Sequence, residues 1–132
     1  MTILSGIVVA GFGLFLIGLA VMAGIRPALV RRFLLSFAGS ARAHYTEMTL
    51  RLFAGAALTG FASSMWYPDV FTVFGWVLIL TTAGLMLIPW QWHHKFAEWS
   101  VPRAIQYLGL FAVVSFSLGL FIIYGMSRAL WP

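Results

Sequence analysis

Long runs of apolar residues alternate along this chain with short connections that carry most of its charged residues. Four runs contain no charged side chain, and they cover residues 1–25, 52–68, 70–94 and 104–127. A helix needs about 20 residues to cross the hydrocarbon core of a bilayer. Each run can therefore cross once, and none can cross twice. Backbone groups in lipid must be paired within their own segment, which favours helices over open sheets.

This pattern predicts an all-α fold, an integral membrane four-helix bundle that forms a single domain over residues 1–132. The expected transmembrane spans are residues 3–25, 44–66, 70–91 and 104–127. A short interfacial amphipathic helix is expected between the first two spans, because Pro27 suits a first helical turn and Leu29 and Phe33 lie on one apolar arc. Ser40 can then cap the next helix.

Composition supports a membrane location. Apolar residues make up 62% of the chain and charged residues only 8%, whereas a soluble domain carries about 25% charged residues. The absence of cysteine excludes disulfides and thiolate metal sites. The net charge of +5 is better explained by membrane topology than by nucleic acid, which we do not expect as a partner.

The basic residues collect in the two longer connections, which predicts the orientation of the chain. The positive-inside rule places both connections in the cytoplasm and both termini outside (N-out/C-out). The same residues would attract anionic lipids. The interfacial basic residues are Arg31, Arg32, Arg42, Lys95 and Arg103.

A weak internal repeat is visible where the first and third spans end. Each ends at a proline, Pro27 or Pro89, and two basic-type residues follow after three positions: Arg31-Arg32 in one half and His93-His94 in the other. True duplication would give two parallel repeats with an axis along the membrane normal. Convergence on a common way to end a span is the favoured explanation.

Small residues within the apolar runs, some of them spaced four apart, favour close approach of helices in lipid, where packing rather than hydrophobic burial drives association. These residues are expected in the contacts of the bundle or in a contact with another subunit. The candidates for helix packing are Gly11, Gly18, Ala56, Gly60, Ser115 and Gly119.

His44, Glu47 and Arg51 form the best candidate polar site, because their spacing places them on one face of a helix. Glu47 and Arg51 are four residues apart and can pair within that helix. A structural pair that anchors the helix at the membrane interface is the favoured interpretation. A role in gating, proton handling or partner docking is the alternative.

His93, His94 and Glu98 form a second polar cluster on the same side of the membrane. Together with His44 and Glu47 they contain enough ligands for a metal on paper, but their spacing matches no strong metal motif. We therefore expect no metal and no cofactor. No nucleophile–base arrangement rises above chance, so we do not expect an enzyme.

The sequence therefore favours a non-catalytic accessory or scaffolding subunit of a larger complex in a bacterial-type inner membrane. Its partners would be other integral membrane subunits, with homo-oligomers as another option, and lipid. An oligomeric small transporter or channel with Glu47 and Arg51 at its cytoplasmic mouth is the alternative. A quinone-, haem- or metal-binding redox component is less favoured.

Overall fold

The structure is a computed structural model that describes residues 2–36 and 40–130. Within these residues it consists of six α-helices and one short 3₁₀-helix, which confirms the all-α prediction. The helix expected between the first two long helices is present as α2. The elements are α1 (Thr2–Ile25), α2 (Pro27–Ser36), α3 (Ala41–Phe61), η1 (Ala62–Ser64), α4 (Pro68–Met86), α5 (Trp90–Gln106) and α6 (Leu108–Leu130).

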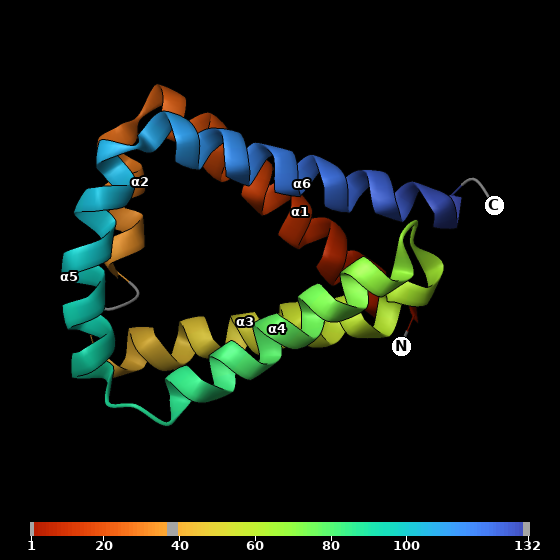
Figure 1. Cartoon of the computed structure of the whole chain (residues 1–132), viewed down its shortest axis with the longest axis horizontal. Coiled ribbons are helices and arrows are strands. Elements are labelled where there is room, and N and C mark those ends of the chain that lie inside the picture. The colour runs from red at the N-terminus through yellow and green to blue at the C-terminus, as the bar shows by residue number, and fades with distance from the viewer. Residues whose placement is uncertain (1, 37–39, 131–132) are drawn as a thin grey trace.

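The helices form an open triangular frame rather than a close-packed bundle (Figure 1). Helix α1 packs along α6, and α3 packs along α4. These two pairs meet at one end, here called the narrow end, and diverge toward the other, here called the broad end. Helices α2 and α5 contact each other and lie across the broad end (Figure 1).

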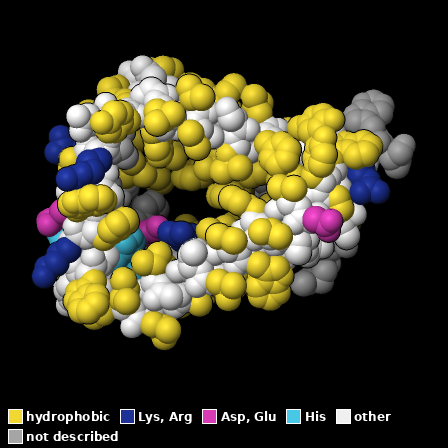
Figure 2. All heavy atoms as spheres, viewed as in Figure 1, with side chains coloured by type: hydrophobic (Ala, Val, Ile, Leu, Met, Phe, Trp, Pro, Cys, Tyr) yellow, Lys and Arg dark blue, Asp and Glu magenta, His cyan; other side chains and the backbone are white. Residues whose placement is uncertain are grey.

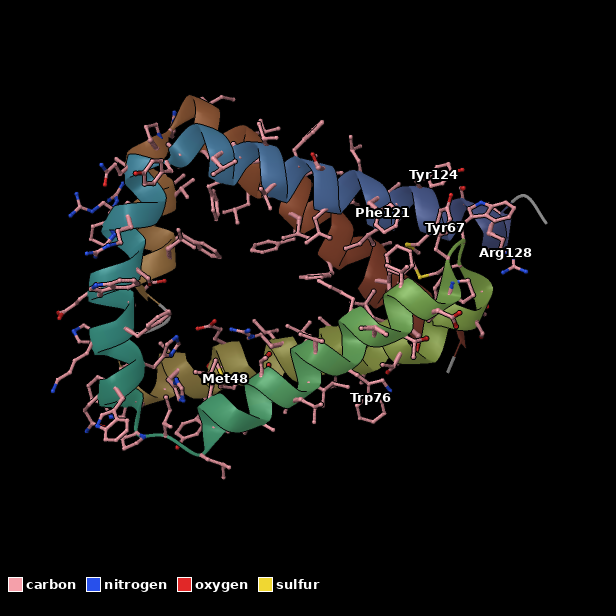
Figure 3. The ribbon with its side chains drawn as sticks, in the orientation of Figure 1. Met48, Tyr67, Trp76, Phe121, Tyr124 and Arg128 are labelled. Carbon is pink, nitrogen blue, oxygen red and sulfur yellow. The ribbon has the colours of Figure 1, made fainter. Side chains whose placement is uncertain are left out.

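The hydrophobic core lies at the narrow end, where both pairs converge. Leu58, Met65 and Ile122 are fully buried there. The Phe71 ring stacks on the Phe121 ring with 4.9 Å between their centroids. Figure 3 shows Phe121 beside Tyr67 at this end, and the two rings stack at 5.9 Å. This core fixes the angle at which the two helix pairs diverge.

Backbone contacts also join the elements of the narrow end. The Trp66 backbone N–H donates to the Gly125 carbonyl oxygen at 2.8 Å. The Arg128 guanidinium donates to the Met65 carbonyl oxygen at 3.1 Å and lies over the Trp66 ring. The connection between α3 and α4 is therefore attached to the last turns of α6.

Each helix pair is held close by glycine. A Cβ atom on Gly119 of α6 would lie 2.7 Å from the Gly13 carbonyl oxygen and 2.7 Å from Ile17 Cγ1, both on α1. A Cβ atom on Gly55 of α3 would lie 3.0 Å from the Gly75 carbonyl oxygen. The same atom would lie 2.7 Å from Cγ1 of the isoleucine four residues further along α4. Only glycine allows backbones to approach this closely.

These two glycine contacts are equivalent to each other, which supports the weak internal repeat considered above. The α4 residues follow their α1 counterparts by 62 residues, and the α6 glycine follows the α3 glycine by 64. Each pair takes one helix from each half of the chain, and α2 and α5 occupy equivalent places. Helices α1 and α4 both run from the narrow to the broad end (Figure 1), as parallel repeats require.

Three of the described helices are long and apolar enough to cross a membrane, not the four that the sequence pattern predicted. They are Ile3–Ile25, Pro68–Met86 and Leu108–Leu130. The prediction of a fourth apolar span over residues 44–66 is wrong, because α3 carries His44, Glu47 and Arg51 in its first half and ends at Phe61. The three apolar helices indicate a multi-pass membrane protein, with α3 packed along α4.

Candidate functional site at the junction of α3 and α5

Helices α3 and α5 begin near each other at one corner of the broad end (Figure 1). Ser40 caps α3, and its hydroxyl oxygen accepts a hydrogen bond from the Ala43 backbone N–H at 3.1 Å, as predicted. Helix α5 begins after Pro89, whose carbonyl accepts from the Trp92 N–H at 3.0 Å. Both first turns therefore have fixed positions, and each presents one histidine to the other helix.

His44 and His93 form a direct contact between these turns. Their Nδ1 atoms lie 2.7 Å apart, and the planes of the two rings are inclined by 65°. At this distance one nitrogen donates a hydrogen and the other accepts it. His44 is fully buried, and the His93 side chain is 11% exposed. This hydrogen bond is shielded from solvent and joins α3 to α5.

Glu47 extends the contact along α3. Its Oε2 lies 3.7 Å from His93 Nε2, and its Oε1 lies 3.3 Å from the Arg51 guanidinium. Both carboxylate and guanidinium are partly buried. The result is a continuous polar cluster in the order His44, His93, Glu47, Arg51, here called the histidine–carboxylate cluster.

The carboxylate selects the proton positions in the cluster. A carboxylate favours a protonated nitrogen beside it, so we assign the hydrogen of neutral His93 to Nε2. His93 Nδ1 then accepts from His44 Nδ1–H, which leaves His44 Nε2 as an acceptor. His44 Nε2 and Arg51 Nε are both buried without a hydrogen-bond partner among the described residues. Such groups are costly to leave unpaired.

Burial lowers the pKa of His93 from its ordinary value. Glu47 opposes this shift and raises the pKa, whereas His44 and Arg51 lower it. The net direction is downward, so His93 is neutral at neutral pH. The Glu47 carboxylate and the Arg51 guanidinium form an ion pair, so their charges offset each other.

The cluster borders an opening between the two helix pairs. Figure 2 shows this opening unfilled by side chains, with hydrophobic atoms along most of its edge. At the edge nearest the start of α5, Figure 2 shows histidine, acidic and basic side chains beside one another. Met48, one turn after His44, is fully buried and labelled in Figure 3.

The second predicted group is divided by the structure. His93 joins the cluster, whereas His94 Nε2 lies 2.8 Å from Glu98 Oε1 within α5. The His94 and Glu98 side chains are 40% and 62% exposed, so this pair lies on the outer surface. Over residues 2–36 and 40–130 no group of three or more histidine, cysteine or acidic residues could hold a metal ion.

The predicted basic residues are exposed on or beside the helices of the broad end. Arg103 donates to the Trp99 carbonyl oxygen at 2.7 Å and lies over the Trp99 ring at 4.1 Å. The exposed basic side chains of this end are Arg26, Arg31, Arg32, Arg42, Lys95 and Arg103. Figure 2 shows several Lys and Arg side chains at this end of the molecule.

The predicted packing residues have different surroundings. Gly119 lies in the α1–α6 contact, and the Ser115 hydroxyl donates to the Leu16 carbonyl oxygen at 2.7 Å. Gly11 and Gly18 are exposed, with nothing described within 4 Å of an added Cβ. Ala56 and Gly60 are exposed as well.

Sequence reasoning did not include among its packing candidates three further glycines of the α1–α6 and α3–α4 contacts, because the small-residue pairs that it used did not contain them. They are Gly13, Gly55 and Gly75. The repeat contained the signal, since the half-chain offset aligns Gly13 with Gly75 and Gly55 with Gly119.

The repeat also shows that the polar corner is not duplicated. The α6 residues that correspond to His44, Glu47 and Arg51 are Leu108, Phe111 and Ser115. The frame therefore repeats, but the three polar positions of α3 have no charged or imidazole counterpart in α6. Packing alone does not require this difference, which makes the cluster the best candidate for a functional site.

Fold and site together indicate a multi-pass helical membrane protein, whose described residues include an internal polar cluster at the broad end of an open frame. Comparisons of the chain with protein-family models, with curated proteins and with solved structures found no match.

Proposed function

We propose that this protein is a non-catalytic accessory subunit of a larger complex in a bacterial inner membrane. The open frame carries this proposal, because the two helix pairs pack together at the narrow end only. The walls of the opening therefore have few partners within the chain. Helices of another integral membrane subunit, packed on the outer faces of the pairs, would stabilise this open arrangement, since helix association in lipid depends on close fit.

The outer face of α4 supports a role in binding partner helices. Val73, Trp76, Val77 and Leu80 are each more than half exposed and lie on one side of the helix. Figure 3 shows Trp76 directed away from the frame. Lipid can cover such a surface, so the test must distinguish a specific protein contact from lipid contact.

The charge distribution supports an orientation with the broad end in the cytoplasm. Exposed arginines of α2 and of the first turn of α3 lie near the broad end, whereas Asp69 and Arg128 lie at the narrow end. Basic residues collect on the cytoplasmic side of inner membranes. In this orientation the broad end would bind anionic lipid headgroups.

Site-specific photo-crosslinking in native membranes tests the subunit role. A photoreactive amino acid in place of Trp76 should crosslink to one integral membrane protein and give one discrete product. The same amino acid in place of Leu80 should crosslink to the same protein. The same amino acid at buried Phe71 provides the control and should give none. A chain that yields no product and purifies alone as a monodisperse species would contradict the proposal.

Arg51 provides a second test of assembly. Because Arg51 is the one arginine of the partly buried cluster, Arg51→Ala should reduce the yield of intact complex more than Arg31→Ala or Arg32→Ala. The yield is measured by pull-down in a gentle detergent. Equal losses in the three variants would show that Arg51 has no special role in assembly.

A small transporter acting as an oligomer remains the second candidate, and the charged edge of the opening favours it. The hydroxyl groups of the apolar helices give this candidate less support than the charged edge does. Thr72, Thr81 and Thr82 each donate to a backbone carbonyl of their own helix, which leaves them less able to line a polar path. Absence of ion flux in reconstituted vesicles would remove this candidate.

A further inference from the structure

We propose that the histidine–carboxylate cluster binds the ring of a quinol, a para-dihydroxy aromatic headgroup, and that the opening holds its isoprenoid tail. This site goes beyond the subunit role. It requires no partner subunit, so the two proposals can fail independently.

The charge of the cluster favours an uncharged headgroup. Glu47 and Arg51 form an ion pair at 3.3 Å, and His93 lies beside the same carboxylate. A phosphate or carboxylate ligand would meet the Glu47 charge and would find no unbalanced cation. The exposed arginines of the broad end, by contrast, have no such neutralising partner at 4 Å or less among the described residues.

The two unpaired groups indicate which hydrogen bonds the ligand makes. His44 Nε2 requires a donor and Arg51 Nε requires an acceptor. A hydroxyl group is both donor and acceptor. His44 and Arg51 are seven residues apart, about 10 Å along the helix axis, so one small hydroxyl cannot serve both. A ring with hydroxyls on opposite edges can approach both groups.

Access to both groups requires a small local movement, because His44 Nε2 and Arg51 Nε each have less than 1 Å² of accessible surface. Met48 lies one helical turn after His44 along the same face and is also buried. Its side chain is unbranched and adopts many conformations at low cost. Rotation of Met48 is therefore the simplest way to open this wall of the site.

Apolar room for a tail is available at the broad end. A groove of about 400 Å³ lies between α1 and α2, and its volume falls in the usual range for ligand pockets. It is lined by Phe15, Gly18, Leu19, Met22, Leu29, Val30 and Phe33. The opening between the helix pairs offers further apolar surface beside the cluster (Figure 2).

The repeat gives an independent reason to treat this corner as a ligand site. Two halves that share their glycine contacts would have no structural need for different corners. One corner nevertheless carries the cluster, and the α6 positions of the other carry Leu108, Phe111 and Ser115. A ligand with one polar end and one apolar end fits an opening with one polar and one apolar corner.

Binding measurements on the purified chain in nanodiscs test this site. The probes are decylubiquinol, kept anaerobic, decylubiquinone, and decylbenzene, which lacks every ring oxygen. We expect decylubiquinol to bind most tightly, because only its hydroxyls can donate to His44. Each lost hydrogen bond should weaken binding about tenfold. Equal affinity for decylbenzene would overturn the proposal.

Matched variants locate the site. His93→Gln and Arg51→Leu should weaken decylubiquinol binding about tenfold. The matched controls are His94→Gln and Arg42→Leu, which replace an exposed histidine and an exposed arginine. Both should leave decylubiquinol binding unchanged. Equal affinity in all four variants, or displacement of the probe by phosphatidylglycerol, would contradict the proposal.

A measurement on the unaltered chain tests the proposal even where a variant fails to fold. In the nitrogen spectrum of ¹⁵N-histidine-labelled protein, decylubiquinol should shift the signals of His44 and His93 and leave His94 in place. A shift of His94 alone, or no shift at saturating probe, would overturn the proposal.

Discussion

At the scale of single residues, His93 and His94 show how neighbouring identical side chains acquire different roles. A helix turns by about 100° per residue, so the two imidazoles point in different directions from the first turn of α5. His93 meets buried His44, whereas His94 pairs with exposed Glu98. Only the position of α3 beside this turn decides which histidine is buried.

The lowered pKa of His93 predicts that acid weakens the junction between α3 and α5. Because the folded pKa lies below the unfolded value of 6.5, the unfolded chain binds more protons in the window just below pH 6.5. Stability is therefore complete above this window and is lost as the pH falls through it. The midpoint of thermal unfolding in detergent, measured across this range, should decrease toward acid pH.

Variants at the two histidines separate this effect from general acid denaturation. His93→Gln should flatten the pH dependence in the window below pH 6.5, because it removes the titrating group. His94→Gln should retain the dependence of the unaltered chain. If the unfolding midpoint of His93→Gln still decreases toward acid pH, another group causes the acid sensitivity.

At the scale of elements, glycine determines how closely the helices pair. Gly119→Ala and Gly55→Ala should each cost about 1–3 kcal/mol, because the added Cβ would lie 3.0 Å or less from a backbone oxygen of the facing helix. The effects should be similar, since the two contacts are equivalent. Unfolding in detergent, followed by circular dichroism, measures both.

Gly11→Ala and Gly84→Ala are the matched controls for these substitutions. Both glycines are helical and exposed, with nothing described within 4 Å of an added Cβ. Alanine should be neutral or stabilising there, because glycine is a weaker helix former by about 1 kcal/mol. Equal losses at control and contact positions would show that the glycine contacts do not determine pairing.

The elements themselves were largely predictable from local signals. The apolar runs predicted α1, α4 and α6, Pro27 marked the start of α2, and Ser40 capped α3. The prediction of a fourth apolar span is wrong because the apolar run that begins at residue 52 is too short by itself, and the half of α3 that precedes it is polar.

At the scale of the whole molecule, the proposed orientation can be measured directly because the chain contains no cysteine. Single cysteines at Ser36 and Gln106 should react with a membrane-impermeant thiol reagent only after the cells are opened. Cysteines at Ser63 and Ala129 should react in intact cells. All four sites are exposed and lie at opposite ends of the frame. Uniform labelling, or the reverse pattern, would contradict the orientation.

The sequence by itself determined the helical class and the polar face of α3 and indicated a membrane environment, because these depend on composition and on the spacing of residues along one helix. It also contained the repeat, although the span-ending prolines indicated it only weakly. The glycine contacts made the offset clear, because they show which residues of the two halves occupy equivalent places.

The tertiary structure decided how the helices pair and which polar groups meet. Helix α1 packs with α6 rather than forming a closed bundle with all the others, and the core gathers at the narrow end. His44 and His93, 49 residues apart, consequently share a hydrogen bond beside an opening. Spacing along a chain places residues on a face, but only the packing of two elements determines what that face meets.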